Sequence, residues 1–103
     1  MSKIKSFFIG NPLARAREKL EDEQRVLAHR SAEMHYADAM RNFYNRQVST
    51  VDPHKDWWRF ADMKQKHQEQ FEHYTRCADR VAESEARVAA LQNEVSKLEN
   101  PDA

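Results

Sequence analysis

The side chains best suited to chemistry are the histidines, and their spacing does not favour a metal site. His29 with His35 and His67 with His73 are each six residues apart. Metal-binding pairs on a helix prefer a spacing of three or four residues, because that spacing brings both rings to one face. The two pairs could converge only across a hairpin that places residue 35 opposite residue 67. We therefore expect ordinary solvated or partly packed histidines and no bound metal.

The single cysteine and the acidic clusters do not predict catalysis either. Cys77 falls in a heptad seam where a small apolar residue fits, so we expect a buried, unreactive thiol. The chain has no glycine-rich phosphate loop, no nucleophile elbow and no Cys-x-x-Cys motif. Its carboxylates at 21–23 and 69–72 are explained by solvated helix faces. We expect no enzymatic activity and no cofactor.

Charge makes nucleic acid an alternative partner. Lys plus Arg and Asp plus Glu each number 17, so the chain has no large net field. Basic residues nevertheless gather near its start: Lys3, Lys5, Arg15, Arg17 and Lys19. Glu18 and the acidic residues at 21–23 interrupt them, whereas a phosphate-binding surface repeats bases along one face with few acids. A nucleic-acid-associated coiled coil that uses this basic region is the alternative hypothesis.

A membrane role has weaker support in the sequence. Lys3 and Lys5 precede Phe7, Phe8 and Ile9, which gives a short basic and apolar tip. Three apolar residues are too few for a signal-peptide core or a transmembrane span, and such a tip has only marginal affinity for a bilayer. With a lone cysteine and no targeting segment, we expect a cytoplasmic protein.

Three prolines, each preceded by Asn or Asp, divide the chain. An Asx side chain can cap the first turn of a helix, and proline suits the first helical position because its missing N–H has no partner there. The pairs at 11–12 and 52–53 therefore predict helix starts, and the pair at 100–101 predicts a stop. The predicted parts of one all-α domain, 1–103, are an N-terminal segment at 1–11, a helix at 12–48, a turn at 49–52, a helix at 53–99 and a tail at 100–103.

Both predicted helices carry heptad repeats. The second helix has a seam made of Tyr74, Cys77, Val81, Ser84, Val88, Leu91, Val95 and Leu98. The first helix has Leu13, Leu20, Leu27 and Met34, followed by Ala37, Met40, Tyr44 and Val48. Two long amphipathic helices with a short connection predict an antiparallel hairpin with a coiled-coil stalk. The alternative is one continuous helix kinked at Pro53.

The predicted boundaries leave part of the second helix uncovered. If both helices start from the turn, the second extends about ten residues further, and Leu91, Val95 and Leu98 have no partner on the first. Either the segment 7–9 folds back over them or a second subunit covers them. A lone two-helix hairpin buries little area, so we expect a homodimer that forms a four-helix bundle. A monomer braced by its N-terminal segment or by a foreign partner is the alternative.

Most aromatic residues gather on either side of the predicted turn. They are Tyr36, Phe43, Tyr44, Trp57, Trp58, Phe60, Phe71 and Tyr74. Trp57 and Trp58 point about 100° apart on a helix, so one two-helix seam does not bury both. Either they close the turn over Phe43 and Tyr44, one inward and one partly covered, or one of them belongs to an exposed binding patch.

These patterns together predict a non-enzymatic protein-binding module. A rigid helical surface would dock on a larger protein and block, bridge or chaperone it. The predicted contact residues are Phe7, Phe8, Ile9, Arg15, Arg17, Phe43, Tyr44, Trp57 and Trp58. Size and simplicity suit an accessory or inhibitory protein of a phage or other mobile element, or a secretion-type chaperone.

Overall fold

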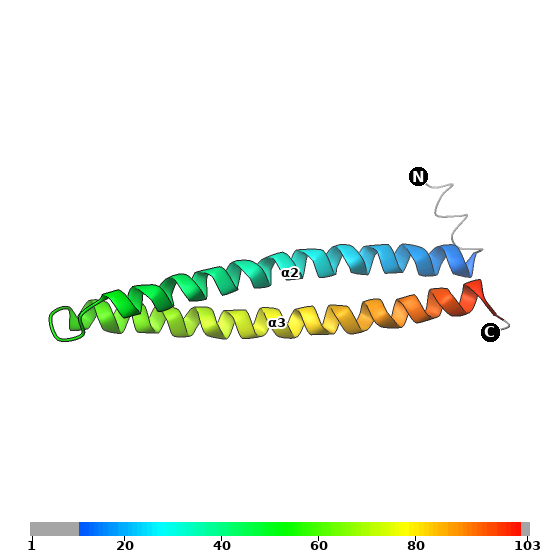
Figure 1. Cartoon of the computed structure of the whole chain (residues 1–103). Helices are drawn as coiled ribbons and strands as arrows, with labels where there is room; N and C mark the ends of the chain where they lie inside the picture. Colours follow the sequence, from blue (N-terminus) through cyan, green and yellow to red (C-terminus); the bar gives the residue numbers. More distant parts are fainter. Residues whose placement is uncertain (1–10, 102–103) are drawn as a thin grey trace. The chain divides into compact units, whose positions relative to one another are not determined.

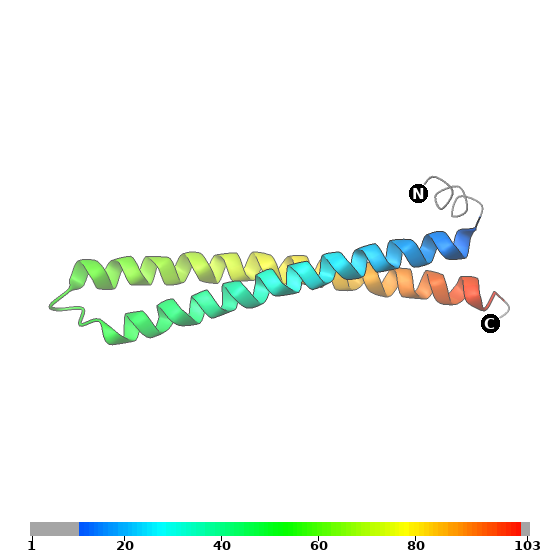
Figure 2. The same ribbon diagram turned by 90° about the horizontal axis from the view of Figure 1, so that it is seen from above.

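The computed structural model describes residues 11–101, and two long helices account for most of them. Helix α2 spans Pro12–Thr50 (39 residues) and helix α3 spans Trp57–Glu99 (43 residues), with no strand between residues 11 and 101. The all-α antiparallel hairpin is confirmed. Its contacts group into two compact units, which we treat separately. Unit 1 comprises the described residues of Met1–Ala28 and Ala82–Ala103, and unit 2 is His29–Val81. In each unit a stretch of α2 lies beside a stretch of α3 (Figures 1 and 2).

Helix α2 begins where the Asn-Pro pair predicts. The Asn11 side-chain oxygen accepts a hydrogen bond from the Ala14 N–H (3.1 Å), and the Asn11 carbonyl accepts from the Arg15 N–H (3.1 Å). The side chain thus caps the first turn and Pro12 takes the first helical position. At the other end, α2 runs two residues past the predicted boundary at 48.

Helix α3 begins four residues later than predicted, so the boundary at Pro53 is wrong. The Asp52 carboxylate accepts from the N–H groups of His54 (2.8 Å) and Lys55 (3.4 Å), and its carbonyl accepts from Asp56 (2.9 Å). This closes one separate turn over residues 53–56. The Asp56 carbonyl then accepts from the Phe60 N–H (2.9 Å), which starts α3. Asp52 therefore caps the connecting turn, and α3 begins behind a second aspartate.

In unit 1 the two helices are joined by a thin apolar seam and by ion pairs. Ala16 on α2 and Val88 and Val95 on α3 are buried. Among the described residues of this unit, two ion pairs cross between the helices: Arg17 with Glu99 (2.7 Å) and Arg87 with Glu23 (2.9 Å).

The expected ten-residue overhang of the second helix is wrong. The two helices differ by only four residues, because α2 is longer and α3 shorter than predicted. Arg17 near the start of α2 therefore reaches Glu99 at the end of α3. Val95 is buried, Leu91 is half-buried and Leu98 is 38% exposed. The proposed plug, residues 7–9, lies outside the described residues.

In unit 2 the buried seam is made of small side chains. Ala37, Val51, Cys77 and Val81 are buried, so the predicted burial of the Cys77 thiol is confirmed. No buried side chain among residues 11–101 is larger than valine. The larger apolar side chains of unit 2 are half-buried or exposed, and the exposed ones are all aromatic.

Candidate partner-binding surface

The two adjacent tryptophans at the start of α3 are largely exposed. Trp57 is 70% exposed and Trp58 is 63% exposed. The interpretation in which they close the turn over Phe43 and Tyr44, with one pointing inward, is therefore wrong. Because α3 starts at Trp57, both rings belong to its first turn, where the preceding residues 51–56 do not cover them. Exposed tryptophan is a common anchor of protein interfaces.

The other two aromatic residues of the predicted site are in contact with each other. The rings of Phe43 and Tyr44 meet edge to face, with centroids 5.2 Å apart and an interplanar angle of 74°. Tyr44 is half-buried in the seam, and Phe43 is 43% exposed. This is the one ring-to-ring contact found between residues 11 and 101. The structure thus pairs Phe43 with Tyr44 but brings neither tryptophan ring against them.

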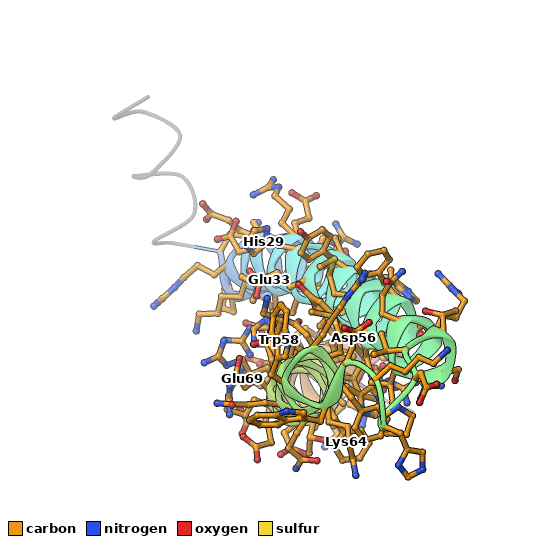
Figure 3. All side chains as sticks on the ribbon, turned by 90° about the vertical axis from the view of Figure 1, so that its left-hand side faces the viewer. His29, Glu33, Asp56, Trp58, Lys64 and Glu69 are labelled. Atoms are coloured by element: carbon orange, nitrogen blue, oxygen red, sulfur yellow. The ribbon has the colours of Figure 1, made fainter. Side chains whose placement is uncertain are left out.

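One side of unit 2 presents aromatic residues from α2. His29 and Glu33 project from this side (Figure 3), and Nε2 of His29 lies 2.6 Å from Oε1 of Glu33. Tyr36 and Phe43 follow His29 at intervals of seven residues, so they share its side of the helix. Both are exposed. Aromatic surface therefore continues along α2 on the side marked by His29.

The opposite side of unit 2 presents aromatic residues from α3. Lys64 projects away from the side that carries His29 and Glu33 (Figure 3). Trp57 and Phe71 lie seven residues before and after Lys64 and share its side of α3. Phe71 is 45% exposed. Unit 2 thus carries exposed aromatic side chains on two opposite sides.

Arg41 on α2 contacts an aromatic residue, Phe71, on the side of unit 2 that carries Lys64. The Arg41 guanidinium carbon lies 5.2 Å from the Tyr74 ring centroid and 5.9 Å from that of Phe71. The same guanidinium binds the Asp38 carboxylate (2.6 Å), which balances its charge. Stacking on two aromatic faces is favourable for arginine, and more so where water is partly excluded. Arg41 therefore contacts one face of the Phe71 ring, and the ring stays 45% exposed.

Sequence reasoning missed the Arg41 cluster, although a signal for it exists. Arg41 continues the heptad series that contains Leu27 and Met34, so the repeat places it in the seam. A charged residue at a seam position needs a partner, and aromatic residues on the facing helix are suitable ones. Naming Phe71 and Tyr74 requires the register between the helices, which the shifted start of α3 changes.

The basic residues at the start of α2 have acidic neighbours on α3 in unit 1. Arg17 binds Glu99. Arg15 and Lys19 line a shallow hollow together with Glu94. Acidic side chains therefore accompany the bases, which weakens an anion-binding surface. The predicted residues Lys3, Lys5, Phe7, Phe8 and Ile9 lie outside the described part of the chain.

We searched residues 11–101 for a metal site, a reactive thiol and a membrane-spanning helix. No group of three or more His, Cys, Asp or Glu side chains within residues 11–101 is arranged to hold a metal ion. The Cys77 sulfur lies 3.8 Å from Nε2 of His73, but the thiol is buried in the seam. Neither α2 nor α3 contains an apolar stretch long enough to cross a bilayer. The exposed aromatic side chains of unit 2 are the most distinctive surface feature.

The fold and this surface define the chain as a helical hairpin with exposed aromatic residues. Comparison with protein-family models, with curated proteins and with solved structures found no match.

Proposed function

We propose that the chain is a non-enzymatic protein-binding module that docks on a larger protein through the exposed aromatic residues of unit 2. The observation that carries this proposal is the exposure of both Trp57 and Trp58. Two adjacent indole rings exposed to water lack the favourable free energy of apolar burial. Docking on a partner surface would supply it. Tryptophan also loses little conformational freedom when it binds, since it has only two side-chain torsions.

The mechanism we propose is occupancy of a partner surface. The hairpin supplies a preformed helical surface, so little ordering entropy opposes docking. Trp58 projects from α3 near the connecting turn, where a partner can reach it (Figure 3). Docking there would block, bridge or chaperone the partner. An accessory or inhibitory role of the kind found in phages and other mobile elements, in the cytoplasm and as a homodimer, belongs to the same proposal.

Affinity capture from the native cell tests this function. The wild-type chain, Trp58→Ala and Val26→Ala serve as baits, with mass spectrometry of the captured proteins. Val26 is an exposed apolar residue of unit 1, so its substitution controls for a general loss of apolar surface. We expect Trp58→Ala to lower capture of a specific protein at least about tenfold while Val26→Ala does not.

Circular dichroism accompanies the capture experiment. Equal helicity of the three baits assigns the loss to the surface. Unchanged capture by Trp58→Ala, or loss of capture only when helicity is also lost, contradicts the proposal.

A further inference from the structure

A second row of side chains runs along α3 beside its buried seam. Its members recur at alternating intervals of four and three residues: Trp57, Ala61, Lys64, Gln68, Phe71, Thr75 and Ala78. We call this the low-charge row. This spacing places the members along one stripe of the helix, as in a coiled-coil seam. The described structure places the row at the surface of unit 2, with Trp57 and Phe71 well exposed.

The low-charge row is unusual because the chain is rich in charge. One of its seven members, Lys64, is charged, whereas 33% of all residues in the chain are. The Lys64 ammonium also lies 5.6 Å from the centroid of the Phe60 ring, which satisfies part of its charge. Loss of charge combined with aromatic residues is the composition of an interface core.

The flank of α3 on the other side of the seam has the opposite composition. Its members have the same spacing and are all ionisable: Arg59, Asp62, Lys66, Glu69, His73, Arg76 and Arg80. We call this the charged row. Glu69 and Lys64 project from α3 in different directions (Figure 3). The two rows therefore flank the same seam but differ in charge, the property that separates an interface from a solvated surface.

We propose that the low-charge row is the surface through which two copies of this chain pair, with their α3 helices antiparallel about a two-fold axis near Gln68. This inference rests on the self-association included in the proposed function and names its surface. A two-fold interface uses the same patch on both copies, so the patch must be complementary to itself.

The order of side chains along the row meets this requirement. Trp57 is at one end of the row, and the small Thr75 and Ala78 are at the other. Antiparallel pairing therefore sets the bulky end of each copy against the small end of its partner copy. Large side chains facing small ones let two helices pack closely. A parallel pairing would instead bring the two Trp57 rings together at one end and leave space at the other.

Charge along the row also fits antiparallel pairing. Lys64 and Phe71 are placed about equally far from Gln68, so the pairing brings each ammonium toward the Phe71 ring of the other copy. Ammonium groups over aromatic rings are attractive, whereas two lysines facing each other are not. Arg41, which stacks on the Phe71 ring, binds the Asp38 carboxylate. The Asp38 carboxylate therefore offsets the Arg41 charge beside Phe71.

Sedimentation of two matched variants tests the pairing. Phe71 is 45% exposed and lies in the low-charge row, and Phe43 is 43% exposed on the opposite side of unit 2. We expect the wild-type chain and Phe43→Glu to sediment as dimers. We expect Phe71→Glu to raise the dissociation constant at least about 100-fold, because it places two carboxylates in the interface. A wild-type monomer, or equal effects of the two substitutions, would overturn the proposal.

Cysteine crosslinking locates the axis. Because Gln68 lies near the proposed axis, Gln68→Cys should form a disulfide-linked dimer under mild oxidation. Glu69→Cys is the control, since the neighbouring position belongs to the charged row. The buried Cys77 should not crosslink in the wild-type chain. Crosslinking of Glu69→Cys in preference to Gln68→Cys would refute the proposed surface.

The outcomes separate this inference from the proposed function. If the chain is monomeric while Trp58→Ala still abolishes partner capture, the pairing is wrong and the protein-binding function stands. If Phe71→Glu abolishes partner capture and the wild-type chain is monomeric, the low-charge row binds the foreign partner, and the pairing is again wrong. If the chain dimerises through the row and Trp58→Ala captures normally, the pairing stands and the proposed docking surface fails.

Discussion

The two compact units use different kinds of contact to hold the same two helices. In unit 1, exposed ion pairs such as Arg17 with Glu99 flank a seam of alanine and valine. In unit 2, a half-buried arginine stacks on two aromatic rings, and five large aromatic side chains stay exposed: Tyr36, Phe43, Trp57, Trp58 and Phe71. Ion pairs complete a surface that is stable in water, whereas exposed aromatic rings are better stabilised by a partner. This difference is the reason that we propose a binding role for unit 2 and none for unit 1.

The largest expected effect comes from the buried seam of unit 2. Ala37→Asn places an amide where the alanine is fully buried, and the free energy of unfolding should fall by about 2 kcal/mol. Ala39→Asn is the control, because Ala39 is exposed on the same helix and shares the change in helix propensity. Chemical denaturation measures both. Equal losses for the two variants would mean that the seam of unit 2 is not packed as described.

An intermediate effect is expected for the aromatic cluster. Arg41→Ala removes the stacking on Phe71 and Tyr74 and the ion pair with Asp38, and should cost about 1 kcal/mol of unfolding free energy. Arg46→Ala, an exposed arginine on the same helix, should have little effect. Thermal unfolding followed by circular dichroism makes the comparison. A loss for Arg46→Ala as large as that for Arg41→Ala would show that the cluster adds no stability.

The smallest effect is expected for the ion pairs of unit 1. Arg17→Ala should lower the unfolding free energy by about 0.5 kcal/mol or less, because both partners are well exposed to solvent. The difference from wild type should shrink further as salt is added, since salt screens exposed charges. Denaturation at low and high salt measures this. An effect larger than that of Arg41→Ala would reverse the comparison between the units.

Local rules predicted most of the fold. The Asn11-Pro12 pair marks the start of α2, and the heptad repeat identifies Cys77, Val81 and Val88 as buried. Both features depend on residues close together in the sequence. The start of α3 was less determined, because Asp52 and Asp56 can each begin a helical turn. The structure uses both, one after the other.

The surface was harder to predict than the fold. Helical geometry states that Trp57 and Trp58 point in different directions, but not that both are exposed. That depends on where α3 begins and on what the connecting turn covers. The Arg41 cluster likewise depends on the register between two helices, and a shift of a few residues changes which rings the guanidinium meets.

The central claim is that unit 2 carries the partner-binding surface, and footprinting of the captured complex tests it most directly. Hydroxyl radicals modify exposed side chains, so the free chain should be modified at Trp58 in unit 2 and at Val26 and Leu98 in unit 1. We predict that complex formation strongly lowers modification of Trp58 and leaves Val26 and Leu98 unchanged. Protection of Val26 and Leu98 with undiminished modification of Trp58 would contradict the account.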